Sequence, residues 1–258
     1  MAESAIIFGV TLFLWALQYR KTHPWLLGLA AAVAYNAKQS TLAIFPVGII
    51  AVSWIQQPTR NLAKLIKNLT MYLGVFIFIT VLLNPLLWKH PLQAFLSSWR
   101  ARTAFTEQQL TTIQSQAPNQ VLQGIPQRGL SLTNNLYLNK PSVADVGNYL
   151  PDTQESTEVY FNIPGTSFGR GLIFGSIWIT LTAGGVFFTL AKLHTHSQSR
   201  RHDLILLLLA TLAQASALLL FVPIPWQRYV MPLLPLVTLW IALGMSPFFD
   251  LFTKNKPY

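Results

Sequence analysis

Residues 34–46 read AYNAKQSTLAIFP and place Lys38 within one of the most apolar parts of the chain. The surrounding segment, residues 24–55, would be roughly 48 Å long as one continuous helix, well beyond a bilayer core of about 30 Å. The polar group at 36–41 divides it into two apolar pieces of about 12 to 15 residues, the length of re-entrant helices. The sequence therefore predicts a helical hairpin at 24–55 with Lys38 at its tip.

The composition is that of a membrane protein. Hydrophobic residues make up 52% of the 258 residues and charged residues only 10%, whereas a soluble domain carries about 25% charged residues. Apolar runs of the roughly 20 residues that a span needs occur near 69–88, 171–192, 204–223 and 229–248, with a slightly shorter run near 4–19. Together with the two arms of the hairpin, they predict an all-α, polytopic membrane helical bundle of about seven membrane segments.

Basic residues in short loops and at the C-terminus predict the orientation of the chain. If 24–55 is a hairpin, these basic residues all lie on the inner side of the membrane: Arg20, Lys21, Arg60, Lys64, Lys67, Lys192, Arg200, Arg201, Lys254 and Lys256. If 24–55 is a single span, every such group after it moves outside, against the positive-inside rule. We therefore expect an integral membrane protein of the bacterial plasma membrane, with the N-terminus outside and the C-terminus inside. These loops also account for much of the net charge of +10, so nucleic acid is not an expected partner.

The predicted spans divide the chain into three parts. Residues 1–88 hold the first membrane segments and the hairpin, residues 89–170 form one external loop domain, and residues 171–258 hold three C-terminal membrane segments. Apolar residues recur at helical spacing at the start of the external part, after Pro91: Leu92, Phe95, Leu96 and Trp99. This spacing predicts an amphipathic helix on the outer surface of the membrane.

Lys38 is the first candidate for a binding site. An ammonium group at membrane depth is costly unless it snorkels, pairs or lines a wet cavity. One interpretation is a lysine that only snorkels at the hairpin tip. The other is an anion site, in which Lys38 meets a phosphate and residues 39–41 offer neutral hydrogen bonds.

Arg228 and Glu3 are predicted on the same outer side as Lys38. Arg228 lies between the last two spans, flanked by Trp226 and Tyr229, and an arginine can grip phosphate with two parallel hydrogen bonds. It also fits an interfacial arginine in an aromatic belt. Glu3 is the only acid before residue 107, and a terminal glutamate is usually solvated. Two cations at one outer interface would suit a lipid phosphate.

Other polar groups give weaker signals. The absence of cysteine excludes disulfides and thiolate metal sites. A His-x-His pair, His194 and His196, lies in an inner loop whose neighbouring arginines favour a solvated segment over a metal site. The GxSxG match at 165–169, with Ser167, lacks the preceding strand that a hydrolase needs. No spacing selects a catalytic pair among the acids of the external part: Glu107, Asp145, Asp152, Glu155 and Glu158.

Several stretches resemble the membrane glycosyltransferases of the GT-C class, namely glycosyltransferase family 39, the protein mannosyltransferase and aminoarabinose transferase relatives. They are MAESAIIFGVTLFLWAL at 1–17, WLLGLAAAVAYNAKQSTLAIFPVGIIAV at 25–52, NPLLWKHPLQAF at 84–95 and RYVMPLLPLVTLWIALGM at 228–245. The resemblance implies transfer of a sugar from a polyprenyl or dolichyl phosphate donor to an acceptor on the external face, with inversion at the anomeric carbon. It implies that Lys38 lies beside the donor site, that Arg228 and Tyr229 approach the lipid phosphate, and that Glu3 borders the same cavity. The expected partners are this lipid-linked donor and membrane lipids, and a divalent metal is left open as a cofactor.

The chain departs from the family at its catalytic acid. That acid, an aspartate in the first external loop, has no counterpart, because the similarity begins several spans later in the family pattern. We therefore expect the C-terminal part of a glycosyltransferase, with the catalytic residue unknown and activity dependent on a missing N-terminal portion or a partner subunit.

Two other functions remain open. In a transporter or flippase-like protein, Lys38 and Arg228 would line a path for an anionic lipid or solute. A matched pair of interrupted segments in the two halves of the chain would favour this function, but the sequence shows only one such segment. In a noncatalytic membrane subunit, the external loop would bind a partner.

Overall fold

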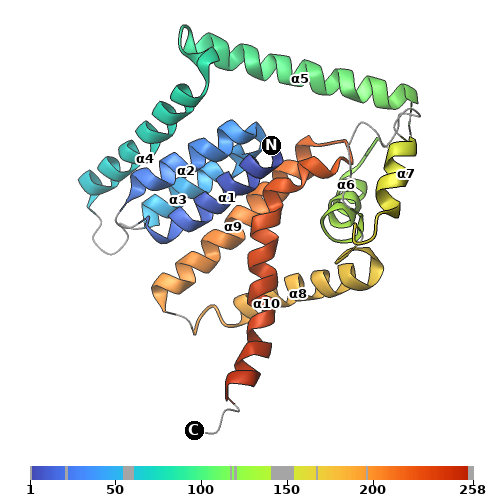
Figure 1. Ribbon diagram of the computed structural model, residues 1–258. Helices are drawn as coiled ribbons and strands as arrows, with labels where there is room; N and C mark the ends of the chain where they lie inside the picture. Colours follow the sequence, from blue (N-terminus) through green and yellow to red (C-terminus); the bar gives the residue numbers. More distant parts are fainter. Residues whose placement is uncertain are drawn as a thin grey trace.

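The computed structural model describes residues 2–20, 23–54, 61–116, 118, 121–140, 154–166, 168–195 and 197–254. All regular secondary structure in these ranges is helical, which confirms the predicted all-α class (Figure 1). Seven residues considered above lie outside the described ranges: Lys21, Arg60, Asp145, Asp152, Ser167, His196 and Lys256.

Helix α2 (Pro24–Ala37) packs between α1 (Ala2–Gln18) and α4 (Leu62–Leu83). Glycine and alanine allow this close approach. A Cβ atom on Gly9 of α1 would lie only 2.6 Å from the Cα atom of Ala34, and one on Gly28 of α2 would overlap the carbonyl oxygen of Tyr72 in α4. The Gly/Ala-rich sequence of α2 thus makes it the central helix of this half of the molecule.

The backbone leaves the α-helical conformation at Lys38, which is extended at φ −160° and ψ 125°. A 3-10 helix, η1 (Gln39–Ile44), and then α3 (Phe45–Trp54) follow. Arg20, just after α1, forms an ion pair with Asp203 of α9, and Trp54 at the end of α3 lies against the ring of His202. Both ends of the 24–54 segment therefore lie at the same end of the helix bundle, opposite Lys38.

The region after α4 is also helical. A 3-10 turn, η2 (Pro85–Leu87), leads into α5 (Pro91–Gln116), which lies across the top of Figure 1. The apolar residues predicted on this helix are all exposed: Leu92, Phe95, Leu96 and Trp99. Helix α6 (Ile125–Thr133), the π-helix η4 (Asn134–Leu138) and α7 (Gln154–Asn162) follow, and η4 packs along α8.

The C-terminal part contains α8 (Gly171–Ala191), α9 (Gln198–Phe221) and α10 (Leu234–Lys254), with the 3-10 turns η7 (Gln227–Tyr229) and η8 (Met231–Leu233) before α10. Helices α8 and α10 meet where Gly185 lies on the backbone of Trp240 and Gly244 lies on that of Leu181. Neither glycine has space for a Cβ atom, so small residues at this crossing allow backbone contact.

Within the described residues, three helices are long and apolar enough to cross a membrane: Leu62–Leu83, Gly171–Ala191 and Gln198–Phe221. Four shorter apolar helices accompany them: Glu3–Gln18, Pro24–Ala37, Gln39–Trp54 and Met231–Pro247. Large apolar side chains on α4 and α8 face outward, including Phe78 and Ile173. Such exposed apolar faces are typical of helices in contact with lipid.

Two predicted span boundaries were wrong. The run near 69–88 ends as a helix at Leu83, because Asn84 precedes a proline and is extended, at φ −121° and ψ 94°. The run near 229–248 begins its α-helix at Leu234, after the 3-10 turns. Pro232 lies in the second of these turns, and a proline supplies no backbone N–H donor.

Candidate functional site

Lys38 and Arg228 meet at one end of the bundle, although 190 residues separate them in sequence. The ammonium Nζ of Lys38 donates a hydrogen bond of 2.7 Å to the main-chain carbonyl of Arg228. The helix break positions Lys38, and the turn η7 positions Arg228. The structure therefore brings together the two cations that the sequence analysis selected.

The ring of Tyr229 lies close to both charged side chains. The Lys38 ammonium is 4.5 Å from the centroid of this ring, and the Arg228 guanidinium carbon is 5.7 Å from it. The same guanidinium lies 4.5 Å from the ring of Trp226, which is 1% exposed and stacks parallel to Tyr229. A cation over an aromatic face gains about 0.5–2 kcal/mol, more when water is excluded. The aromatic pair thus holds two positive charges within 5.7 Å of the Tyr229 ring centroid.

Arg102 of α5 is a third cation at this end of the bundle. Its Nη1 donates a hydrogen bond of 2.9 Å to Oε1 of Gln39, the residue after Lys38. Farther along α5, Ile113 is fully buried in a small cluster with Trp226, which fixes the helix over the site. Arg102 does not stand out among the basic residues in the sequence. Its only sequence signal is the i, i+3 spacing from Trp99, which puts the two side chains on one helix face.

Glu3 is exposed in the first turn of α1. Because Gly9 packs against Ala34 in an antiparallel helix pair, the residues before Gly9 run toward the same end as Lys38. The structure therefore places Glu3 at the Lys38 end of the bundle, on its surface. A carboxylate in a first turn is also favourable with the helix dipole.

Residues 39–41 were expected to offer their neutral hydrogen-bonding groups to an anion. In the structure, these residues instead make hydrogen bonds within the protein. The Thr41 hydroxyl is buried and donates to the Lys38 carbonyl at 2.8 Å, because the turn brings the two together. Gln214 of α9 is 0% exposed, and its Nε2 donates to the Ser40 carbonyl at 3.2 Å. Among the described residues, the buried Ser40 Oγ and Gln214 Oε1 have no hydrogen-bond partner. A buried polar atom of this kind marks a place where a water or a ligand atom would be stabilised.

The remaining candidates do not converge. His194 is exposed, His202 stacks on Trp54 at 5.0 Å, and Glu107 and Glu155 are exposed on separate helices. Over the ranges given above, no group of three metal-ligating side chains forms. The polar groups that gather are the cations and neutral hydrogen-bonding groups around Lys38.

Comparisons with family models, with curated proteins and with solved structures found no match. The resemblance to family 39 therefore stays a prediction from the residues that carry it.

Proposed function

We propose that the chain is the donor-binding, C-terminal part of a membrane glycosyltransferase. In this proposal it binds the phosphate of a polyprenyl- or dolichyl-linked sugar at Lys38, Arg228 and Tyr229. The observation that carries the proposal is the contact between Lys38 and Arg228, which holds two positive charges against one tyrosine ring. Arg102 adds a third charge at Gln39, and clustered arginine and lysine side chains suit a phosphate.

The proposed membrane arrangement follows from the apolar helices. The three long ones and four shorter ones would make a polytopic bundle of about seven segments, with 89–170 as an external loop domain. Lys38 and Arg228 would then face the outside of a bacterial plasma membrane, with the N-terminus outside and the C-terminus inside. The positive loops and the Arg20–Asp203 pair would lie at the inner end.

The test is binding and turnover of a radiolabelled polyprenyl-phosphate sugar by the purified chain in nanodiscs. We expect Lys38→Gln and Arg228→Gln each to reduce binding at least tenfold, whereas Lys89→Gln, an exposed lysine at the start of the external part, retains it. Binding without turnover would support a fragment that lacks its catalytic acid. Wild-type affinity in both site variants would overturn the proposal.

A transporter or flippase for an anionic lipid is the second candidate. The backbone is irregular on both sides of the cation site, at Lys38 and at η7–η8, and broken helices form substrate sites in many transporters. Movement of a fluorescent anionic lipid between leaflets of proteoliposomes, lost in Lys38→Gln, would favour this function. Sugar turnover without lipid movement would exclude it.

A further inference from the structure

An open pocket of about 570 Å³ lies beside α6, η4 and the turn after α9. This volume falls within the roughly 300–1,000 Å³ of small-molecule sites. Its lining residues are Pro118, Val121, Leu122, Gln123, Gln127, Leu130, Ser131, Asn134, Asn135, Asn139 and Pro225. None of them is charged, and amides and one hydroxyl supply the polar groups. Each side-chain amide offers both donors and acceptors.

Hydrogen bonds hold part of this amide cluster in place. Asn135 is 6% exposed, and its Nδ2 donates to the carbonyl of Pro225 at 2.8 Å. Its Oδ1 accepts from Nδ2 of Asn139 at 2.7 Å. The Oε1 atom of Gln127 accepts from the backbone N–H of Gln123 at 2.8 Å. The cluster is therefore preorganised rather than a set of independent surface side chains.

A second, independent feature of the pocket is its backbone. Residues Asn134–Leu138 form a π-helix, closed by a hydrogen bond of 2.7 Å from the N–H of Asn139 to the carbonyl of Asn134. Turns of this kind are rare and occur frequently at functional sites. Here the π-turn places Asn134 and Asn139 next to each other at the pocket. In the described part of the chain, the side chains of Asn134 and Gln123 make no hydrogen bond with protein and are exposed.

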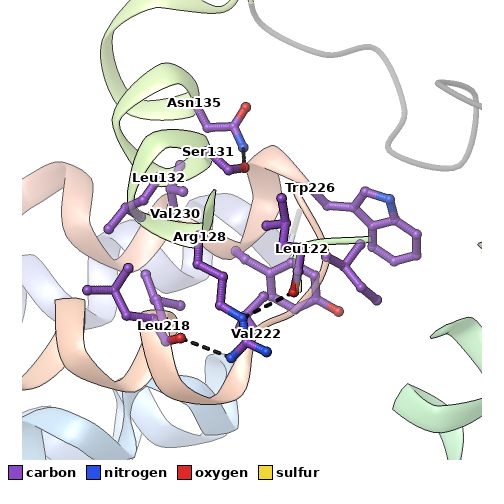
Figure 2. Close-up of a pocket in the computed structure, with 12 residues that line it drawn as sticks. Leu122, Arg128, Ser131, Leu132, Asn135, Leu218, Val222, Trp226 and Val230 are labelled. Atoms are coloured by element: carbon purple, nitrogen blue, oxygen red, sulfur yellow. Dashed lines mark hydrogen bonds between the residues drawn. The ribbon is translucent and has the colours of Figure 1, made fainter. Parts of the chain in front are cut away.

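Two basic residues are adjacent in sequence to lining residues, Arg128 after Gln127 and Lys140 after Asn139, and both have other partners. The Lys140 ammonium lies 5.3 Å from the centroid of the Phe161 ring. Arg128 lines a smaller cavity of about 20 Å³ that shares Leu122, Ser131 and Asn135 with the open pocket. Its guanidinium donates to the carbonyls of Leu122, Leu219 and Leu220 at 3.4, 3.0 and 2.8 Å. Figure 2 shows it pointing away from Ser131 and Asn135. A cation in this position stabilises the C-terminus of α9. The described residues that line the open pocket are themselves uncharged.

We infer that this pocket binds an uncharged polyhydroxylated molecule, a carbohydrate by chemical class. The amides match hydroxyl groups that both donate and accept, and Leu122, Leu130 and Pro225 offer apolar surface to ring C–H groups. The absence of charge among the lining residues that the structure describes disfavours a phosphate here, in contrast to the Lys38–Arg228 site. The inference goes beyond the proposed phosphate site and does not rest on it.

The test is saturation-transfer NMR on the full chain in nanodiscs with three probes: methyl α-D-mannoside, methyl β-D-glucoside and methyl β-D-xyloside. We expect transfer to the ring protons of at least one glycoside. The transfer should fall at least fivefold in Asn134→Leu and in Gln123→Leu. The matched control is Gln93→Leu, which removes an exposed amide from α5 and should leave the signal unchanged.

Gln123 precedes α6, and its side chain makes no hydrogen bond with the residues that the structure describes, so this variant keeps the test valid if Asn134→Leu fails to fold. Lys38→Gln should retain glycoside transfer, which separates this inference from the proposed phosphate site. Three outcomes would overturn the inference: no transfer to any of the glycosides, wild-type transfer in both pocket variants, or transfer only to an uncharged peptide such as acetyl-Ala-Ser-Ala amide.

Discussion

Arg20 forms an ion pair with Asp203 while its own side chain is 3% exposed. The same guanidinium donates to the carbonyl of Leu17 at 2.6 Å, and its Nη2 atom has no partner in the described ranges. This pair joins the end of α1 to the beginning of α9, at the end of the bundle opposite Lys38.

We expect Asp203→Ala to destabilise the protein by about 1–3 kcal/mol, because Arg20 would keep its charge while buried without a carboxylate. The estimate is below that for a fully buried pair, since the Asp203 side chain is 46% exposed. The measurement is the thermal unfolding midpoint in detergent. The double variant Arg20→Met/Asp203→Ala should recover part of the loss, and a double variant no more stable than the single one would contradict the buried-charge explanation.

Tyr229→Leu should weaken binding of the polyprenyl-phosphate sugar about 3- to 30-fold, because the ring that holds Lys38 and Arg228 together is lost. Tyr229→Phe keeps the aromatic face and should bind within about twofold of wild type. Equilibrium binding in nanodiscs measures both. Equal losses in the two variants would show that the hydroxyl, rather than the ring, is what matters.

Arg102→Gln should lower the affinity for the same lipid about 2- to 10-fold, because it removes one positive charge beside Gln39. Arg100→Gln on the same helix is the control, since Arg100 is exposed and lies on a different face. The salt dependence of binding gives an additional check. If Arg100→Gln lowers the affinity equally, Arg102 contributes to binding through the general surface charge and not through a contact at the site.

Gly185→Ala should cost about 1–3 kcal/mol, because its methyl group would overlap the backbone of Trp240. Gly184→Ala is a close control, since the nearest atom to its Cβ, on Phe188, lies at 3.8 Å. Alanine there should be neutral or stabilising by up to about 1 kcal/mol. Thermal unfolding in detergent separates the two. Similar midpoints for both variants would show that α8 and α10 do not cross as closely as described.

The proposed orientation is testable because the chain has no cysteine. We expect Ser115→Cys, on exposed α5, to react with a membrane-impermeant maleimide added to intact cells. Thr195→Cys, in the loop before α9, should react only after the membrane is permeabilised. The reverse pattern would mean that the positive loops lie outside.

The amino-acid sequence alone was enough to predict the helical class, the apolar segments and the position of the break at Lys38. These properties depend on composition, on the length of apolar runs and on local backbone preference, all of which can be read within a single segment. The errors fell at helix ends, at 84 and near 229–234, where prolines and 3-10 turns outweighed hydrophobicity.

Only the tertiary structure reveals the hydrogen bonds from Arg102 to Gln39 and from Gln214 to Ser40. The same holds for the ion pair between Arg20 and Asp203. The tertiary structure also assembles the amide pocket from α6, η4 and the turn at Pro225. Each of these contacts joins elements that are far apart in the chain, and which polar side chains meet depends on how the helices pack. Apolar periodicity predicts which side of a helix is buried, but it does not specify the partner on the other side.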